Sequence, residues 1–173
     1  MSKSTAINID KEFSKLSFLR GRTPETTNEE AEGAFALLSE YRDGGIYIAH
    51  YSGFSEWEKH SSGDEFVQIL DGKTTLILLE KNQEQRSNLI KGEIFIVPKN
   101  IWHRFESPDG VKVMTITPQP TEHSISYKTS TTLDGSRQLA WPVSPFFAKK
   151  QWRKKVSDLL RSWFCRINTL IKG

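Results

Sequence analysis

The segment WEKHSSGDE, residues 57–65, decides how the rest of this 173-residue chain is interpreted. It places Glu58 and His60 two positions apart and ends with the acidic pair Asp64 and Glu65. Since alternate residues of a strand share one face, Glu58 and His60 are predicted to point into a common interior. Adjacent residues face opposite ways, so only one carboxylate of the acidic pair can line that interior.

A second segment, GEIFIVPKNIWHRF at residues 92–105, supplies another histidine, His103. If Glu65 and His103 come from neighbouring strands, two imidazoles and one or two carboxylates converge on one point. Such a donor set suits a divalent iron, manganese, nickel or zinc ion with positions open to water, oxygen or substrate. The two segments therefore predict a metal site in the interior of the fold.

Short runs with the character of β-strands surround both segments, and turn residues separate them. Strands are predicted over residues 35–41, 46–51, 65–70, 74–80, 88–90, 93–97, 101–105 and 111–117. The breaks between them lie at 43–45, 62–64, 71–72, 91–92, 98–100 and 108–110, and several have the composition of tight hairpin turns. Many short strands with no helical pattern among them predict a sandwich or a small barrel.

The spacing within the two segments resembles the two half-motifs of the cupin superfamily over about residues 34–120. The motif positions that match are His60, Glu65, Gly72, Gly92, Pro98 and His103. Three positions differ, with Glu58 in place of the first histidine, Asn100 in place of a glycine and Ser107 in place of the final asparagine. Asparagine can replace glycine at a turn because it tolerates positive φ.

Within that superfamily the chain is similar to small bacterial single-domain cupins with a Trp-x-x-His-x-x-Gly-Asp-Glu signature. Further matches to that group are Val97, Trp102, Thr117, Pro118, Thr121 and His123. The resemblance implies an all-β fold, the cupin double-stranded β-helix or jelly-roll barrel. It also implies that Glu65, rather than Asp64, is the inward-facing carboxylate, and that His60, Glu65 and His103 hold the metal.

The role of Glu58 stays open at this point. It can be a fourth metal ligand, a partner that orients an imidazole, or a catalytic general base. The alternative to a metal site is a barrel in which His60 and His103 are hydrogen-bonded interior residues.

A small-molecule metalloenzyme of the oxygenase, isomerase or lyase type is the leading hypothesis for function. The competing hypothesis is a non-catalytic metal- or ligand-binding sensory module that acts through the basic C-terminal segment. Phe105, Val67 and His123 are candidates for the substrate pocket, although an aromatic such as Phe105 also suits the core and His123 also suits the surface. His50 is interpreted as a structural histidine.

The positive charge is concentrated at the C-terminus. Residues 146–173 contain eight basic residues and one acidic residue, whereas the formal net charge of the whole chain is +3. Apolar residues in this segment recur at three- and four-residue steps, which predicts a basic amphipathic helix. The helix is expected to pack on the barrel or a second subunit, to lie on an anionic membrane surface, or to dock a partner protein. Nucleic acid is not an expected partner, and Cys165 has no motif of a catalytic thiol.

The predicted organisation is an N-terminal arm over 1–33, a barrel over 34–128, an extended linker over 129–145 and the helix over 146–173. Asp10 is a candidate N-cap for a short helix in the arm. The single cysteine excludes a disulfide framework. The absence of a long apolar run and of a signal-like N-terminus favours a cytoplasmic protein, peripheral to a membrane at most. A homodimer is the expectation from the resemblance.

Overall fold

The computed structural model describes residues 6–126, in which one short helix precedes a nine-stranded sheet. The elements are α1 (Ile9–Phe13), β1 (Leu19–Arg22), β2 (Phe35–Tyr41), β3 (Gly44–Phe54), β4 (Trp57–His60), β5 (Glu65–Glu80), β6 (Gln83–Ile90), β7 (Ile94–Val97), β8 (Trp102–Pro118) and β9 (Thr121–Ser124). The predicted all-β barrel is confirmed. The predicted linker and C-terminal helix, together with Cys165, lie outside the described residues.

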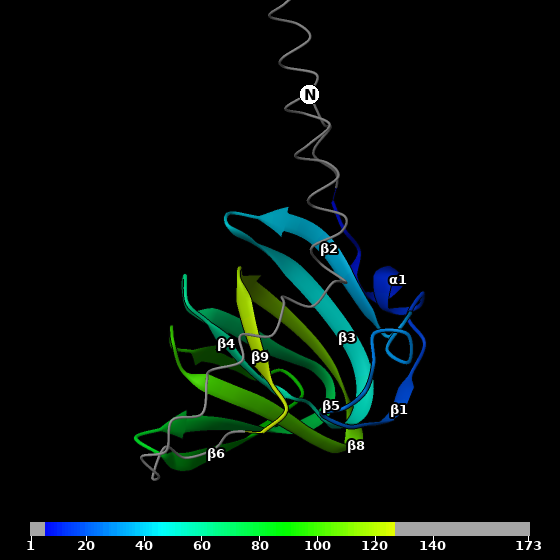
Figure 1. Cartoon of the computed structure of the whole chain (residues 1–173). Helices are drawn as coiled ribbons and strands as arrows, with labels where there is room; N and C mark the ends of the chain where they lie inside the picture. The colour runs from blue at the N-terminus through cyan, green and yellow to red at the C-terminus, as the bar shows by residue number, and fades with distance from the viewer. Residues whose placement is uncertain (1–5, 127–173) are drawn as a thin grey trace, which may run out of the picture. The chain divides into compact units, whose positions relative to one another are not determined.

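The sheet curls around its own inner face (Figure 1). Its hydrogen-bonded path runs β1-β3-β8-β4-β9, with β2 on β3 and with β5 joining β6, β7 and β8. The two long strands β5 and β8 pair antiparallel from Phe66 opposite Ile116 to Leu79 opposite Trp102. They therefore run through the whole barrel, while β1 and β9 form the two ends of the path.

The inner face of the curled sheet is filled by one hydrophobic cluster. Its buried members are Ala49, Tyr51, Val67, Ile69, Leu76, Leu78, Leu89, Val97, Phe105, Val111 and Val113. On β5 the buried positions alternate from Glu65 to Ile69, as expected for a strand with one face inward. A polar residue within this alternation, such as Glu65, is thereby carried into the interior.

Two of the predicted hairpin turns are bends within continuous strands. Residues 71–72 lie inside β5 and residues 108–110 lie inside β8. The reason is that these bends face each other. A Cβ on Gly72, whose φ is +74°, would lie 2.3 Å from the carbonyl oxygen of Gly110. Glycine lets the two backbones pass this closely, so the strands bend together rather than reverse.

Three further features differ from the sequence-based expectation. The α1 helix is capped by Asn8, whose side chain accepts from the Lys11 amide at 2.9 Å, and not by Asp10. The predicted strand over 88–90 extends back to Gln83. The prediction missed the first part of β6 because its residues are exposed and polar and show no apolar alternation. Within the N-terminal arm, Leu19–Arg22 forms β1 and pairs parallel with β3.

The attachment of β1 depends on Gly53. This residue has φ of +109°, and a Cβ on it would lie 2.1 Å from the carbonyl oxygen of Arg22. Replacing Gly53 with alanine is expected to lower the free energy of unfolding by about 2 kcal/mol or more, because both the backbone conformation and the space oppose a side chain. Urea denaturation measures the change.

Gly63→Ala is the matched control, because a Cβ on Gly63 meets only the Pro118 ring at 3.7 Å, which is ordinary van der Waals contact. Equal stability of the two variants would contradict the proposed role of Gly53 in holding β1.

No helix within residues 6–126 has both the length and the hydropathy that a membrane span requires.

Candidate metal centre

The strand β4 brings the two halves of the motif together. Glu58 on β4 lies directly opposite His103 on β8, and on its other side β4 pairs with β9, where His60 lies opposite Thr121. Glu65 opens β5, which pairs with β8 as well. Because cross-strand neighbours project to the same face of a sheet, the four polar side chains meet on the inner face.

The ligand atoms of Glu58, His60 and His103 all lie within 4.8 Å of one another. Glu65 joins them, with its Oε2 at 3.0 Å from Nε2 of His103 and 3.5 Å from Nε2 of His60. Glu58 Oε1 lies 3.6 Å from Nε2 of His103. His60, Glu65 and His103 are buried, whereas the Glu58 side chain is 23% exposed. The cluster therefore has one accessible side, at Glu58.

Both imidazoles are held by their Nδ1 atoms. His103 Nδ1 lies 3.1 Å from the carbonyl oxygen of Ile101, and His60 Nδ1 lies 3.2 Å from the Thr121 hydroxyl. A carbonyl oxygen can only accept, so Nδ1 of His103 carries a proton. In the neutral form of His103 the lone pair is then on Nε2, which faces the cluster. His60 Nε2 is buried and has no hydrogen-bond partner among the described residues.

The other oxygen of Glu65 is fixed from the opposite side. The Thr117 hydroxyl donates to Glu65 Oε1 at 2.5 Å, and Thr115 is 2.7 Å from Thr117. The neighbouring carboxylate, Asp64, faces away and accepts from the backbone amide of Lys99 at 2.8 Å. Asp64 thus braces the turn before β8, and Glu65 alone enters the cluster.

The protonation states of Glu65 and His103 depend on each other. Burial by itself would raise the pKa of Glu65, but the hydrogen bond from His103, the close approach of His60 at 3.5 Å and the charge of both imidazoles outweigh it and lower the pKa to about 2. Burial lowers the pKa of His103, but the hydrogen bond and charge of Glu65, followed by Glu58, outweigh it and leave the pKa raised. In the metal-free protein a proton on His103 thus accompanies the ionised Glu65.

The candidate pocket residues occupy different environments. Val67 and Phe105 belong to the buried core cluster, and the Phe105 ring lies edge-on to the His103 ring with centroids 6.1 Å apart. His123 on β9 lies opposite Glu58 and forms an ion pair with Glu56 at 2.9 Å. Of the three, His123 alone is half-buried and on the accessible side of the cluster.

His50 lies apart from the cluster. Its ring contacts the Phe18 ring with centroids 4.8 Å apart, beside Asp71 and Lys112. Burial and then the charge of Lys112 lower its pKa.

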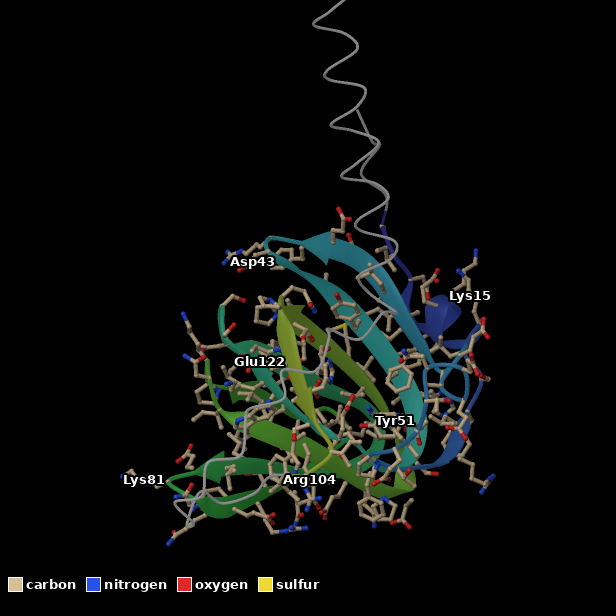
Figure 2. All side chains as sticks on the ribbon, viewed as in Figure 1. Lys15, Asp43, Tyr51, Lys81, Arg104 and Glu122 are labelled. Carbon is tan, nitrogen blue, oxygen red and sulfur yellow. The ribbon has the colours of Figure 1, made fainter. Side chains whose placement is uncertain are left out.

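Sequence reasoning assigned no role to Arg22 and Tyr51, which contact each other with the guanidinium carbon 4.9 Å from the ring centroid. Arg22 comes from β1, a four-residue strand without apolar alternation, so no pattern in the sequence marks it. Tyr51 is buried on β3. Figure 2 labels Tyr51 and also Glu122 on β9, the strand that carries His123. Thr117 and Thr121 did appear in the motif, but their hydrogen bonds to Glu65 and His60 depend on the pairing of β8 and β9.

Comparison with known proteins agrees with the cupin-like fold expected from the sequence. A family model described as a cupin domain matches residues 47–117. A cupin-2 domain containing protein from Shewanella frigidimarina has a TM-score of 0.50 and 20% identity, with 65% of this chain and 94% of that chain covered. A Neisseria meningitidis protein has a TM-score of 0.50 and 16% identity, with 66% and 100% covered. At these identities the likeness concerns the fold alone. The search of curated proteins found no match.

Proposed function

We propose that the barrel of this chain, in which a cupin-domain model matches residues 47–117, binds one divalent transition metal and acts as a small-molecule metalloenzyme. The proposed ligands are His60, Glu65, His103 and Glu58. Iron, manganese, nickel and zinc all accept such a mixture of imidazole and carboxylate donors.

One observation carries the proposal. Two buried imidazoles turn their Nε2 atoms toward the Glu65 carboxylate, and Nε2 of His60, 3.5 Å from it, has no hydrogen-bond partner in the described part of the chain. A buried polar atom without a partner costs free energy, on the order of 1–3 kcal/mol. A metal ion at this point supplies the missing partner. The hydrogen bonds at both Nδ1 atoms are of the kind that orient metal-ligating histidines.

The residues around the centre supply the rest of the chemistry. A bound metal polarises a substrate oxygen or lowers the pKa of bound water. Thr117 holds one oxygen of Glu65, so that the other oxygen stays directed at the imidazoles. Glu58, on the accessible side, is near enough to His103 to act as a ligand and exposed enough to accept a proton from a substrate. Oxygenase, isomerase and lyase reactions are all compatible with these groups.

Metal affinity tests the assignment of the carboxylates. We expect wild-type protein purified without chelators to hold about one equivalent of transition metal. Glu58→Gln and Glu65→Gln are each expected to weaken Mn²⁺ or Zn²⁺ binding about tenfold or more in calorimetric titrations, because each removes a charged ligand. Glu56→Gln is the matched control, since Glu56 pairs with His123 rather than with the cluster.

The result also separates the possible roles of Glu58. Unchanged affinity in Glu58→Gln would exclude it as a ligand and leave two roles, a general base or a partner that orients an imidazole. A wild-type protein that binds no transition metal under any loading condition contradicts the proposed function. Metabolite mixtures incubated with metal-loaded wild type and with His60→Ala, and compared by mass spectrometry, identify a compound that only the wild type consumes.

A further inference from the structure

The outer face of the barrel is apolar where the strands β3, β8, β5 and β7 lie side by side. On each strand the residues next to the core positions point outward, because successive side chains alternate between the two faces. Strand pairing aligns these outward residues in two rows. One row is Ile46, Ile116, Phe66 and Ile96, and the other is Ile48, Met114, Gln68 and Ile94. None of the eight residues is charged.

The N-terminal helix covers one end of this face. α1 lies against the outside of β3 (Figure 1), and its Phe13 is buried. The Phe13 ring centroid is 5.8 Å from Nζ of Lys112, an outward residue of β8. Ile48 is only 1% exposed, whereas Ile94 and Ile96 are 56% and 48% exposed. The part of the face that is still exposed, called the outer patch below, comprises Ile46, Phe66, Ile94, Ile96, Met114 and Ile116.

The strand β7 forms the open edge of this face. Within residues 6–126 it pairs with β5 alone. Natural proteins commonly protect an edge strand from association by placing charged residues on it. On β7, however, both outward positions are isoleucines, Ile94 and Ile96. An apolar strand at an open edge, continuous with an apolar sheet face, is typical of a surface that another protein covers.

The size of the outer patch fits a stable dimer. Ile94 and Ile96 expose on the order of 100 Å² each, and the four half-buried members together add about 200 Å². Because roughly 60% of a protein–protein interface is apolar, about 400 Å² per copy corresponds to about 1,300 Å² for two copies. Stable interfaces bury about 1,200–2,000 Å² in total.

The charges at the two ends of β7 favour a second copy of this chain as the partner. Glu93 directly precedes β7, and Lys99 follows its last residue by two positions. Both are exposed, and neither forms an ion pair within the described part of the chain. A two-fold axis at Ile96, midway between them, brings Glu93 of each copy next to Lys99 of the other.

We propose that the outer patch is a homodimer interface, in which two barrels pack outer face to outer face about a two-fold axis at Ile96. Their β7 strands run antiparallel, as sheets packed face to face keep their strand directions nearly aligned. The inference rests on the geometry and charge of this face and not on the proposed metal chemistry. Glu58 belongs to the inner face of β4, so the interface leaves the accessible side of the metal centre free.

The test uses the full chain as wild type, Ile96→Glu, Ile96→Lys and an equimolar mixture of the two variants. Ile125→Glu is the matched control, since Ile125 is 58% exposed and lies beyond β9, outside the outer patch. Sedimentation velocity at about 1 to 100 µM protein gives the dissociation constant of each dimer. Thermal unfolding midpoints show which variants have kept the fold.

We expect the wild type to dimerise with a dissociation constant below about 10 µM. Ile96→Glu and Ile96→Lys should each raise it at least about a hundredfold, because two like charges meet at the two-fold axis. Mixing the two variants should strengthen dimerisation at least about tenfold over either one alone, since opposite charges then meet. Ile125→Glu should keep the dissociation constant of the wild type.

Three results would overturn the proposal. A wild type that stays monomeric at about 100 µM leaves the outer patch to a different occupant. A dimer whose dissociation constant is unchanged in Ile96→Glu uses another surface. Monomeric variants that the mixture does not rescue exclude a two-fold axis at Ile96.

A milder variant covers the case in which the charged variants do not fold. Ile96→Thr keeps a β-branched residue on the strand and removes only part of its apolar surface. At least about tenfold weaker dimerisation in Ile96→Thr supports the interface, and an unchanged dissociation constant contradicts it. Mn²⁺ titration of the same variant should match the wild type, so failure of the metal centre and failure of the interface appear in separate measurements.

Discussion

Replacing His103 with alanine is expected to abolish metal binding and to destabilise the barrel. His103 is completely buried, and its Nε2 lies 3.0 Å from Glu65 and 3.6 Å from Glu58. Its removal takes away one of only two nitrogen ligands, so the affinity for Zn²⁺ or Mn²⁺ should fall by about two orders of magnitude or more. It also leaves Glu65 buried with a weaker set of partners, which should cost about 3 kcal/mol of unfolding free energy.

His50→Ala is the control for His103→Ala. His50 contacts Phe18 outside the cluster, and its loss should change stability by about 1 kcal/mol or less and leave metal binding intact. Calorimetric metal titrations and urea denaturation of both variants give the two quantities. Full metal affinity in His103→Ala would falsify the proposed centre, whereas loss of stability alone would support the metal-free alternative in which His103 is a hydrogen-bonded interior residue.

The metal-free protein is expected to be most stable between about pH 4.5 and 6.5, and to lose stability on both sides. The pKa of Glu65 falls from 4.5 to about 2 in the folded protein. A group with a lowered folded pKa stabilises the fold above its unfolded value, so this contribution disappears as the pH falls from about 4.5 to about 2. The size of the acid loss should be on the order of 3 kcal/mol.

The alkaline side has the opposite sign. The pKa of His103 is raised above 6.5, so its contribution is complete below pH 6.5 and is lost as the pH rises through the folded pKa. The loss of stability at acid pH and the loss at alkaline pH both arise from the interaction between His103 and Glu65, so the two stability contributions do not add. Denaturation midpoints measured from pH 3 to 9 give the profile.

Metal should reverse the alkaline trend. Imidazoles bind metal in their neutral form, so loading with Zn²⁺ displaces the His103 proton and stabilises the fold increasingly from pH 5.5 to 8. Glu65→Gln should flatten the acid side of the metal-free profile. Asp109→Asn is the control, since Asp109 pairs with Lys73 on the exposed surface and should leave the profile unchanged. A metal-free protein whose stability rises from pH 6 to 9 contradicts this interpretation of the cluster.

The parts of the fold that could be predicted are those that depend on local sequence features. The alternation on β5 and the turn residues between strands are local features, and they correctly predict an all-β barrel. Asn100 has φ of +64°, which confirms its expected role in place of glycine. The bends at Gly72 and Gly110 could not be distinguished from hairpin turns, because a turn and a bend use the same residue types. What separates them is the close approach of β5 and β8, a contact between distant segments.

For the site, the sequence alone establishes which donors are present and predicts that Glu58 and His60 share a face. How these donors meet depends on the tertiary structure, because pairing of β4 with both β8 and β9 places Glu58 beside His103 and His60 beside Thr121. The physical reason is that strand pairing and curling of the sheet join residues that are far apart in the chain, and no periodicity within a single segment records those contacts.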